Sequence, residues 1–418
     1  MDAKRSTVHI VGAGISGLIA ATVLEKQGLA PVIIEASDRP GGRVKTDIVE
    51  GFQLDHGFQV LLTQYPAAQK YLDYNKLELQ EFKAGACVFV KGKPRFFGDP
   101  LRDFGMLFST LFSGIGTLMD KIKIFQLNLK LKKKSIQSIF ETDEQTTLDY
   151  LKSFGFSDKI IEAFFRPFFG GIFLETALVT SSRMFEFVFK LFGEGMAALP
   201  KAGIEAIVQQ LTQKLQHTTF HFNTKVETIK DNVMLLQNGE QISYDYVIIA
   251  TEARGLVANM SAEPIAWKAC QTLYFTTPSR LYQAPFIGLI GNKNSLINNI
   301  FYHNSLPTTQ KGTEELLSVT VVKEHQLSEE ALIAQVTKEL QAACKIEQLS
   351  FLKLYNIPKA LPQLHHLQYD LSKEATQWTN RIFLAGDVQL NGSLNAAMLA
   401  GERAAERVGE LVKQEASV

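Results

Sequence analysis

The order of hydrophobic and polar positions predicts a strand, a turn, a helix and a second strand at the start of the chain. Apolar residues are nearly continuous over Thr7 to Val11, and they recur at helical spacing from Ser16 to Lys26. Gly28 marks the end of that helix, and Pro31 to Glu35 has the pattern of a second buried strand. This order predicts a βαβ unit with parallel strands.

Two later blocks repeat this pattern. The elements predicted for the block from Lys201 to Ala250 are a helix through Ala206, Val208 and Leu211, a strand near Phe220 to Phe222, a hairpin turn at Asn238-Gly239 and a strand at Tyr246 to Ala250. The block from Arg381 to Val412 predicts a buried strand followed by an Ala-rich helix. Both blocks are typical of an α/β nucleotide-binding fold.

The intervening segments have a different composition. Residues 82–192 hold twenty of the 29 phenylalanines, whereas residues 1–60 hold two. The range 259–371 predicts strands at Gln271 to Thr276 and Leu316 to Val322 and an amphipathic helix at Ser328 to Cys344. We therefore expect a second, α+β domain interleaved with the first.

Composition narrows the classes of function. Hydrophobic residues make up 46% of the 418-residue chain, which excludes global disorder. Lys plus Arg equals Asp plus Glu at 43 each, so no excess charge favours a nucleic-acid partner. Three dispersed cysteines suit a reducing compartment, and no apolar run reaches a membrane-spanning length. We expect a cytoplasmic protein, with peripheral contact with a membrane as the alternative.

A glycine motif follows the first strand directly. In Gly12-Ala13-Gly14-Ile15-Ser16-Gly17, the first glycine permits the tight turn, the second lets a pyrophosphate approach, and the third lets the helix pack on the strand. Glu35 ends the second strand, where a carboxylate can accept a hydrogen bond from a ribose hydroxyl. A chance glycine loop is a poor alternative, because strand, helix and acid are in register. The motif predicts a dinucleotide site without choosing between NAD and FAD.

The continuation of the chain resembles a known superfamily of flavoproteins. The segment from Glu35 to Arg43, which contains Arg39-Pro40-Gly41-Gly42-Arg43, is similar to the second glycine motif of flavin amine oxidases, phytoene desaturases and protoporphyrinogen oxidases. Three more segments resemble later motifs of that superfamily, namely Asp55 to Val60, Phe222 to Ala250 and Leu384 to Ala405. The four matches occur in chain order, and the resemblance covers three FAD-binding pieces that make up about half of the chain, with weaker similarity in between.

This resemblance implies FAD as the cofactor. The residues that it implies as cofactor contacts are Gly12, Gly14, Ile15, Ser16, Gly17, Glu35, Ala36, Arg39, Gly41, Gly42, Arg43, His56, Gly57, Phe58, Val226, Gly386, Asp387, Ser393, Leu394 and Asn395. It also implies a Rossmann-type, bipartite FAD-binding domain of residues 1–82, 193–258 and 372–418, and a substrate domain of residues 83–192 and 259–371. No cysteine follows Cys344, so the covalent attachment known in monoamine-type members is not expected.

The aromatic segment Phe164 to Phe173 admits two interpretations. It could line an apolar tunnel to the flavin, because ligand sites are mostly apolar. It could also be ordinary core, because clustered rings bury area wherever they lie. We expect Phe168 and Phe169 on or next to a cavity wall, with Pro167 interrupting a regular helix and bending the chain.

Four titratable residues are weak candidates for chemistry. Lys268 lies in the region where amine oxidases place a lysine near the flavin, although the local pattern favours a surface lysine. His56 adjoins the segment expected beside the flavin, yet a structural histidine is the simpler interpretation. His365 and His366 have no partners at metal-ligand spacing, so no metal is expected.

A basic amphipathic stretch covers residues 101–134. Apolar residues from Leu101 to Leu131 alternate with lysines and end in Lys132-Lys133-Lys134. A core helix that ends in a solvated charge run is the favoured interpretation, and a helix in a membrane interface is the alternative.

These features together predict an FAD-dependent oxidoreductase, an oxidase or dehydrogenase. As the resemblance implies, it would remove a hydride from a hydrophobic small molecule such as a polyene or isoprenoid, a porphyrinogen or a lipophilic amine. A flavin-dependent isomerase and a non-catalytic flavin-binding module are the alternatives, because fold resemblance alone does not fix activity.

Overall fold

The computed structural model describes residues 6–98, 110, 113–230, 232–258, 260 and 264–417. Of the basic stretch at 101–134, residues 101–109, 111 and 112 lie outside the described residues. No helix in the described ranges is both long enough and apolar enough to cross a bilayer.

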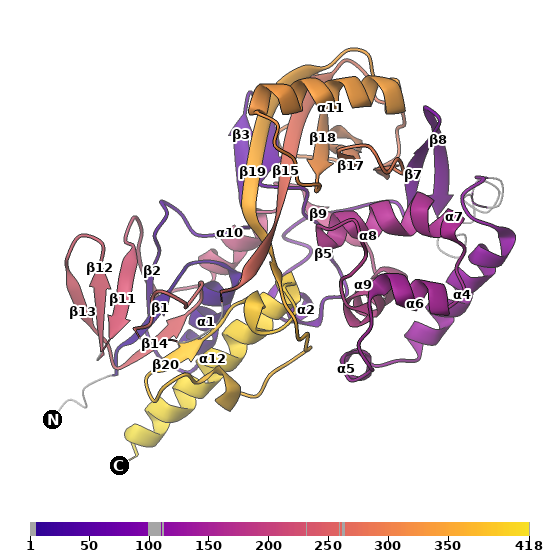
Figure 1. The fold of residues 1–418 in the computed structure, drawn as a ribbon. Coiled ribbons are helices and arrows are strands. Elements are labelled where there is room, and N and C mark those ends of the chain that lie inside the picture. The colour runs from indigo at the N-terminus through magenta and orange to yellow at the C-terminus, as the bar shows by residue number, and fades with distance from the viewer. Residues whose placement is uncertain are drawn as a thin grey trace.

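A five-stranded parallel sheet forms one half of the molecule (Figure 1). Its strands, in spatial order, are β10 (Thr219–His221), β2 (Val32–Ile34), β1 (Val8–Val11), β14 (Tyr246–Ile249) and β20 (Ile382–Leu384). The strands are short and rich in Val and Ile, as parallel strands buried on both faces require. The predicted βαβ unit is confirmed, since His9 to Val11 pair in parallel with Val32 to Ile34.

The parallel sheet is covered on both faces. The helices α1 (Ile15–Lys26) and α12 (Leu394–Glu415) pack on one face and against each other, and α10 (Ala206–Gln213) adjoins α1. A small antiparallel sheet packs on the other face. Its strands are β11 (Val226–Lys230), β12 (Val233–Leu236) and β13 (Gln241–Ser243), and the predicted turn at Asn238-Gly239 joins β12 to β13. The outcome is a three-layer Rossmann-type unit.

A seven-stranded mixed sheet forms the second half, above the first in Figure 1. Its strands, in spatial order, are β19 (Ser350–Gln363), β15 (Ala266–Thr277), β18 (Glu315–Val321), β17 (Ile297–Tyr302), β16 (Ile287–Ile290), β7 (Gly85–Val90) and β8 (Lys93–Gly98). Neighbouring strands are antiparallel except β16 and β7. The predicted helix is α11 (Glu329–Cys344), which begins at its N-cap Ser328 and packs on this sheet.

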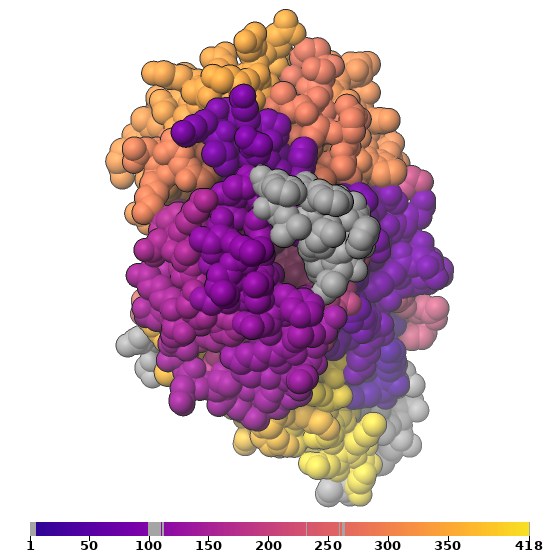
Figure 2. Space-filling model, turned by 90° about the vertical axis from the view of Figure 1, so that its right-hand side faces the viewer, coloured from indigo at the N-terminus to yellow at the C-terminus, as the bar shows by residue number. Residues whose placement is uncertain are grey.

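Helices fill the side of the molecule that faces the viewer in Figure 2. They are α4 (Leu118–Lys132), α5 (Ile136–Phe140), α6 (Thr147–Ser153), α7 (Asp158–Ile160), α8 (Arg166–Phe173) and α9 (Ser182–Glu194). Smaller elements connect the two halves, namely β3 (Thr46–Val49), β4 (Phe52–Asp55), β5 (Leu61–Leu62), α2 (Pro66–Tyr71), β6 (Leu79–Glu81) and β9 (Ala197–Pro200), and the short 3-10 turns are His303–Ser305, Glu374–Thr376 and Asp387–Gln389.

The segment around Pro167 is built differently from the expected bend. The helix continues from α7 into α8 through a π-helical turn at Ile161–Phe165, and Pro167 sits in the first turn of α8. Pro167 has no amide hydrogen to donate to the preceding turn, and the wider π-helical turn just before it accommodates the proline within the continuous helix. The regular α-helix is therefore interrupted by a wider turn and not by a break in the chain.

The strands group by chain segment. All five strands of the parallel sheet come from residues 1–82, 193–258 and 372–418, and all seven of the mixed sheet come from residues 83–192 and 259–371. We propose the two-domain division on the basis of this grouping.

Candidate functional site

One cavity of about 1240 Å³ lies between the two halves of the molecule. Small-molecule and cofactor sites are usually roughly 300–1,000 Å³, so this cavity has room for more than one bound group. The residues expected at the cofactor that line it are Gly12, Gly14, Ile15, Ser16, Glu35, Gly41, Gly42, Arg43, His56, Gly57, Phe58, Gly386, Asp387, Ser393 and Leu394. Fifteen residues from four separate motifs thus converge on one space.

The N-terminus of α1 opens onto this cavity. Its N-cap is Gly14, which supplies no side-chain cap for the first amides of the helix. A Cβ atom added at Gly14 would meet no protein atom within 4 Å, whereas one added at Gly17 would lie 2.0 Å from the carbonyl oxygen of Gly12. Uncapped amides facing empty space suit an anionic group such as a pyrophosphate.

Glu35 is held in a fixed orientation at the end of β2. Its carboxylate accepts hydrogen bonds from the Ala13 amide at 2.7 Å and from the Ser37 amide at 2.8 Å and hydroxyl at 2.7 Å. Carboxylate oxygens have about four acceptor positions, so one remains for a further donor. The arrangement fits recognition of a ribose hydroxyl.

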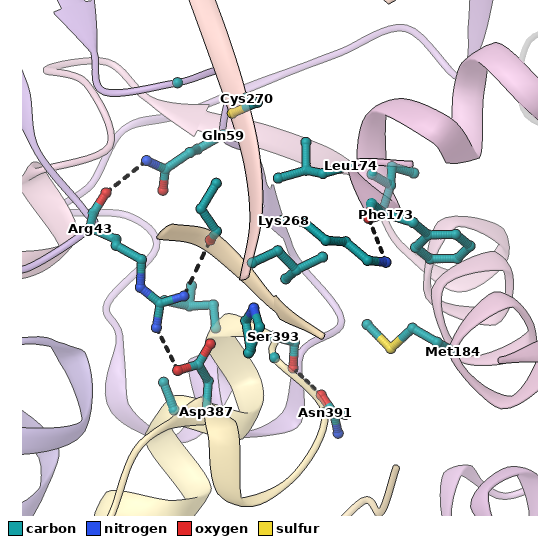
Figure 3. Close-up of a pocket in the computed structure, with 18 of the residues that line it drawn as sticks. Arg43, Gln59, Phe173, Leu174, Met184, Lys268, Cys270, Asp387, Asn391 and Ser393 are labelled. Atoms are coloured by element: carbon teal, nitrogen blue, oxygen red, sulfur yellow. Dashed lines mark hydrogen bonds and ion pairs between the residues drawn. The ribbon is translucent and has the colours of Figure 1, made fainter. Parts of the chain in front are cut away.

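The second glycine motif is bonded to the first. The amide of Gly41 donates to the carbonyl of Ala13 at 2.9 Å, and Gly42 has a φ of +60° that favours glycine. Arg43 then crosses to the C-terminal motif, where its guanidinium pairs with Asp387 at 2.5 Å (Figure 3). The same guanidinium stacks 5.3 Å from the ring of Trp267. One arginine therefore links three segments of the cavity wall.

The C-terminal motif presents a second helix N-terminus. Ser393 caps α12 by accepting from the Ala396 amide at 3.0 Å and donates to Asn391 at 2.7 Å. The α12 helix lies close to α1, because Gly401 has no side chain and the hydroxyl of Ser16 donates to the carbonyl of Ala397. The two helix N-termini are held in a fixed relation at one cavity.

Five residues expected at the cofactor do not line the cavity, and they are Gly17, Ala36, Arg39, Val226 and Asn395. Arg39 is paired with Asp47 at 2.7 Å and Glu205 at 3.2 Å, so its charge is used within the protein. Asn395 is buried, and its side-chain oxygen accepts from the Ala67 amide at 3.0 Å. These contacts fit roles in holding the loops that form the wall.

His56 has structural partners although it lines the cavity. Its Nε2 lies 2.7 Å from a carboxylate oxygen of Asp47, and its ring is 4.5 Å from that of Tyr355. Burial raises the pKa of Asp47, but hydrogen bonds from His56, Tyr355 and Arg39 outweigh it and lower that pKa to about 2. The imidazole is therefore fixed beside a carboxylate that stays ionised.

The aromatic segment divides between wall and core. Phe168 lines the cavity together with apolar residues from α8, α9 and the loop between them, which are Ile172, Phe173, Leu174, Val179, Met184, Val188 and Phe192. Phe169 does not line it and is 1% exposed, with its ring 5.3 Å from that of Phe168 and 4.7 Å from that of Phe185. Both sequence interpretations of the segment therefore apply, each to different rings.

Lys268 differs from the expected surface lysine. It reaches from β15 into the cavity toward α8, where its Nζ donates to the carbonyl of Phe173 and to the hydroxyl of Thr180, both at 3.0 Å (Figure 3). Burial lowers its pKa, and Glu175 partly offsets that shift. The Phe173 and Thr180 contacts join segments about 90 residues apart, which no local pattern could reveal.

Other wall residues were not expected from the sequence. Asn299 of β17 donates to the hydroxyl of Thr320 of β18 at 3.3 Å, and both line the cavity. Cys270 also lines it, and burial raises the pKa of its thiol to about 11. Inward alternation along the predicted strands was the only available signal for these positions.

No cluster of metal-ligating side chains occurs in the described part of the chain. His365 and His366 are exposed, and His365 borders the cavity. The wall combines glycine loops, helix termini and apolar side chains with charged residues such as Arg43, Lys268 and Glu144.

A parallel Rossmann-type sheet whose glycine loops open into a cavity is typical of dinucleotide-binding proteins. The family model of flavin-containing amine oxidoreductases matches residues 15–409, and the chain belongs to this family. Its cofactor is FAD, for which the uncapped N-terminus of α1 and the glycine loops above provide a fitting cradle.

Curated relatives include L-amino-acid oxidases of snakes. One from Bothriechis schlegelii is 24% identical over 96% of this chain and 89% of its own length. Another, from Bothrops atrox, is 26% identical over 59% of this chain. The match spans about half the length of this second relative, at 52%.

Solved structures share the fold. One is a protein from an Exiguobacterium species that is assigned as a protoporphyrinogen oxidase by inference. Its structure has a TM-score of 0.71 at 16% identity, covering 97% of this chain and 99% of its own. Putrescine oxidase bound to putrescine has a TM-score of 0.70 at 17% identity, covering 96% and 98%. At these identities the likeness concerns the fold alone.

Proposed function

We propose that the protein is an FAD-dependent oxidase or dehydrogenase of a hydrophobic small molecule such as a polyene, a porphyrinogen or a lipophilic amine. The observation that carries this proposal is the apolar wall of α8 and α9, which is continuous with the nucleotide cradle in one cavity. Bound FAD supplies the two-electron acceptor for a substrate C–H bond. The chain itself binds, orients and shields the reacting molecules.

The fifteen cavity-lining residues that match the flavoprotein motifs are proposed as the FAD contacts. The N-terminus of α1 would hold the pyrophosphate, and Glu35 would accept from the ribose. The N-terminus of α12 would stabilise negative charge at the opposite end of the cofactor. Arg43 is paired with Asp387, so we assign it to holding the wall rather than to neutralising phosphate.

The rest of the cavity would hold the substrate. Phe168, Phe173 and Met184 offer an apolar surface that excludes water, which favours a substrate with little charge. Asn299 with Thr320 supplies one polar contact pair on the facing sheet. The apolar part of this wall complements a large apolar molecule, and the carboxylate of Glu144 also lines the cavity.

Lys268 is proposed as a positioning residue. Two of its three donor positions are used by Phe173 and Thr180, so the third can hold a water or a substrate atom at the cavity surface. Replacing it with methionine keeps the aliphatic chain and removes the donors. We expect the Lys268→Met protein to bind as much FAD as the wild type and to have a kcat at least about tenfold lower. A loss of this size corresponds to one missing hydrogen bond from a charged donor.

The function is tested by anaerobic mixing of the FAD-loaded protein with candidate substrates from each of the three chemical classes. Loss of the visible flavin absorption on mixing supports an oxidase or dehydrogenase. Conversion that requires prior reduction of the flavin by dithionite identifies an isomerase and overturns the proposal. The variant Val188→Phe narrows the cavity, and it should therefore slow the reaction of the largest substrate more than that of the smaller ones.

A further inference from the structure

The helix α4 carries apolar side chains on two opposite faces. Its inner face buries Leu127 and Leu131 against the helical core. Its outer face exposes Leu118, Ile122, Phe125 and Leu129, with exposed fractions of 64%, 43%, 45% and 45%. Burial of the inner face explains why α4 is part of the fold, but it leaves the outer face unexplained.

The exposed side chains form one continuous stripe. Their spacing of four, three and four residues places them on a single line along the helix. Met119, which is 55% exposed, lies beside the first turn of this stripe. Single exposed apolar residues are ordinary on protein surfaces, whereas a contiguous apolar patch marks a binding surface.

The stripe is bordered by positive charge. At 100° per residue, Lys121 and Lys132 flank it on one side and Lys133 on the other. Residues 118–134 contain six lysines and a single carboxylate, that of Asp120. Asp120 is 1% exposed and is occupied by the capping box with Thr117 and by Ser157, so it does not neutralise the surface.

We propose that the outer face of α4 docks on the surface of an anionic lipid bilayer. An apolar stripe flanked by lysines can insert into the boundary between headgroups and acyl chains while the ammonium groups contact lipid phosphates. A second copy of the chain is a poorer occupant, because it would bring two lysine-rich faces together. The proposal concerns contact with one leaflet, and it does not depend on the identity of the substrate.

The docking face lies one helix away from the cavity. The α4 helix packs against α9, where Lys190 donates to the Leu131 carbonyl at 3.0 Å and Lys134 pairs with Glu186 at 2.7 Å. The side of α9 toward the cavity contributes Met184, Val188 and Phe192. A bilayer held at α4 would therefore lie near the apolar wall.

The test is sedimentation of the FAD-loaded protein with vesicles of phosphatidylcholine, with and without phosphatidylserine. We expect binding to the phosphatidylserine vesicles that falls as salt is raised, and much weaker binding to phosphatidylcholine alone. The double variant Ile122→Ser with Phe125→Ser should bind at least about tenfold more weakly. The matched control, Ile48→Ser with Leu327→Ser, alters an exposed apolar residue of β3 and another in the loop before α11, and it should bind normally.

A charge variant separates the two contributions. Lys132→Gln with Lys133→Gln should lower binding to phosphatidylserine vesicles and weaken its dependence on salt. Flavin content and melting temperature should stay unchanged in every variant, since these side chains are exposed. The proposal is overturned if the wild-type protein stays in the supernatant, or if the control loses as much binding as the α4 variant. It is also overturned if the α4 variant changes the molecular mass in solution without changing lipid binding, because a second copy is then the occupant.

Discussion

At the scale of single residues, two glycines of one motif have opposite requirements for space. Gly14 borders the cavity and has no protein atom within 4 Å of its missing Cβ, whereas the missing Cβ of Gly17 would overlap the backbone of Gly12. The first glycine is therefore needed only if something else fills that space. The second is needed by the protein itself.

We expect Gly14→Val to abolish FAD binding while the free energy of unfolding of the cofactor-free protein falls by only about 1 kcal/mol. Gly17→Ala should instead cost about 1–3 kcal/mol of stability through overpacking. Bound flavin per chain and denaturant unfolding of the cofactor-free proteins are the two measurements. Normal flavin content in Gly14→Val would remove α1 from the proposed cradle.

Replacing Glu35 should weaken FAD binding less than replacing Gly14. Its replacement by alanine removes an acceptor without placing atoms in the cavity, so Glu35→Ala should weaken FAD binding by about 1–3 kcal/mol and not abolish it. Titration of the cofactor-free variant with FAD gives the dissociation constant. An unchanged constant would show that no ribose hydroxyl is bound there.

Neighbouring phenylalanines should respond differently. Phe169→Ala empties a site that is 1% exposed and should cost about 3–5 kcal/mol of stability. Phe168→Ala enlarges the cavity and should chiefly change the affinity for apolar ligands, with FAD content intact. Unfolding experiments and binding of a hydrophobic fluorescent probe distinguish the two. Equal destabilisation by both changes would argue that the wall at Phe168 is ordinary core.

At the scale of elements, the strands β17 and β18 hold a buried histidine. His303 follows β17 and lies 2.9 Å from the Ser318 hydroxyl of β18, and burial lowers its pKa from 6.5 to about 4. The unfolded chain therefore binds a proton more readily than the folded protein between these values. The free energy of unfolding is therefore highest, as far as His303 is concerned, above about pH 6.5, where the imidazole is neutral in both states. It falls as the pH drops from 6.5 toward 4, because only the unfolded chain takes up the proton in that range.

His303→Gln keeps a polar group beside Ser318 without this titration. As the pH falls from 6.5 to 4, the wild type should therefore lose up to about 3 kcal/mol of unfolding free energy relative to the variant. Comparing the two proteins removes contributions common to both, such as that of Asp55, whose pKa is raised to about 6 by burial. A difference that is independent of pH would mean that His303 is already charged or is accessible to water.

Local sequence predicted the elements of the parallel sheet well, because strand, glycine turn and helix follow one another within about thirty residues. It could not predict which face of α4 would be buried, since both stripes have helical spacing and only packing against α9 selects Leu127 and Leu131. The partners of Lys268 were equally hidden, because Phe173 and Thr180 meet it through tertiary structure. The sequence therefore did not predict the contacts of residues whose partners come from a distant segment of the chain.

At the scale of the whole molecule, the cofactor should be held without a covalent bond. No cysteine follows Cys344, and the only cysteine among the described cavity residues, Cys270, has a thiol pKa raised to about 11, which keeps it protonated and unreactive. Acid precipitation should therefore release all the flavin as FAD into the supernatant. Yellow colour retained by the washed precipitate would contradict this expectation.

The position of β20 at the edge of the parallel sheet has a consequence for biosynthesis. The strand β14 can pair with β1 only after more than half of the chain has been synthesised, and its other edge stays open until Ile382–Leu384 leave the ribosome. The α12 helix, which packs on α1, emerges later still. A nascent chain therefore carries an uncovered α1 for most of its translation and an unpaired edge of β14 for part of it, a state prone to association with other chains. We expect stable flavin capture only after the last helix has been released, so that cellular yield depends on chaperones that bind the unfinished sheet.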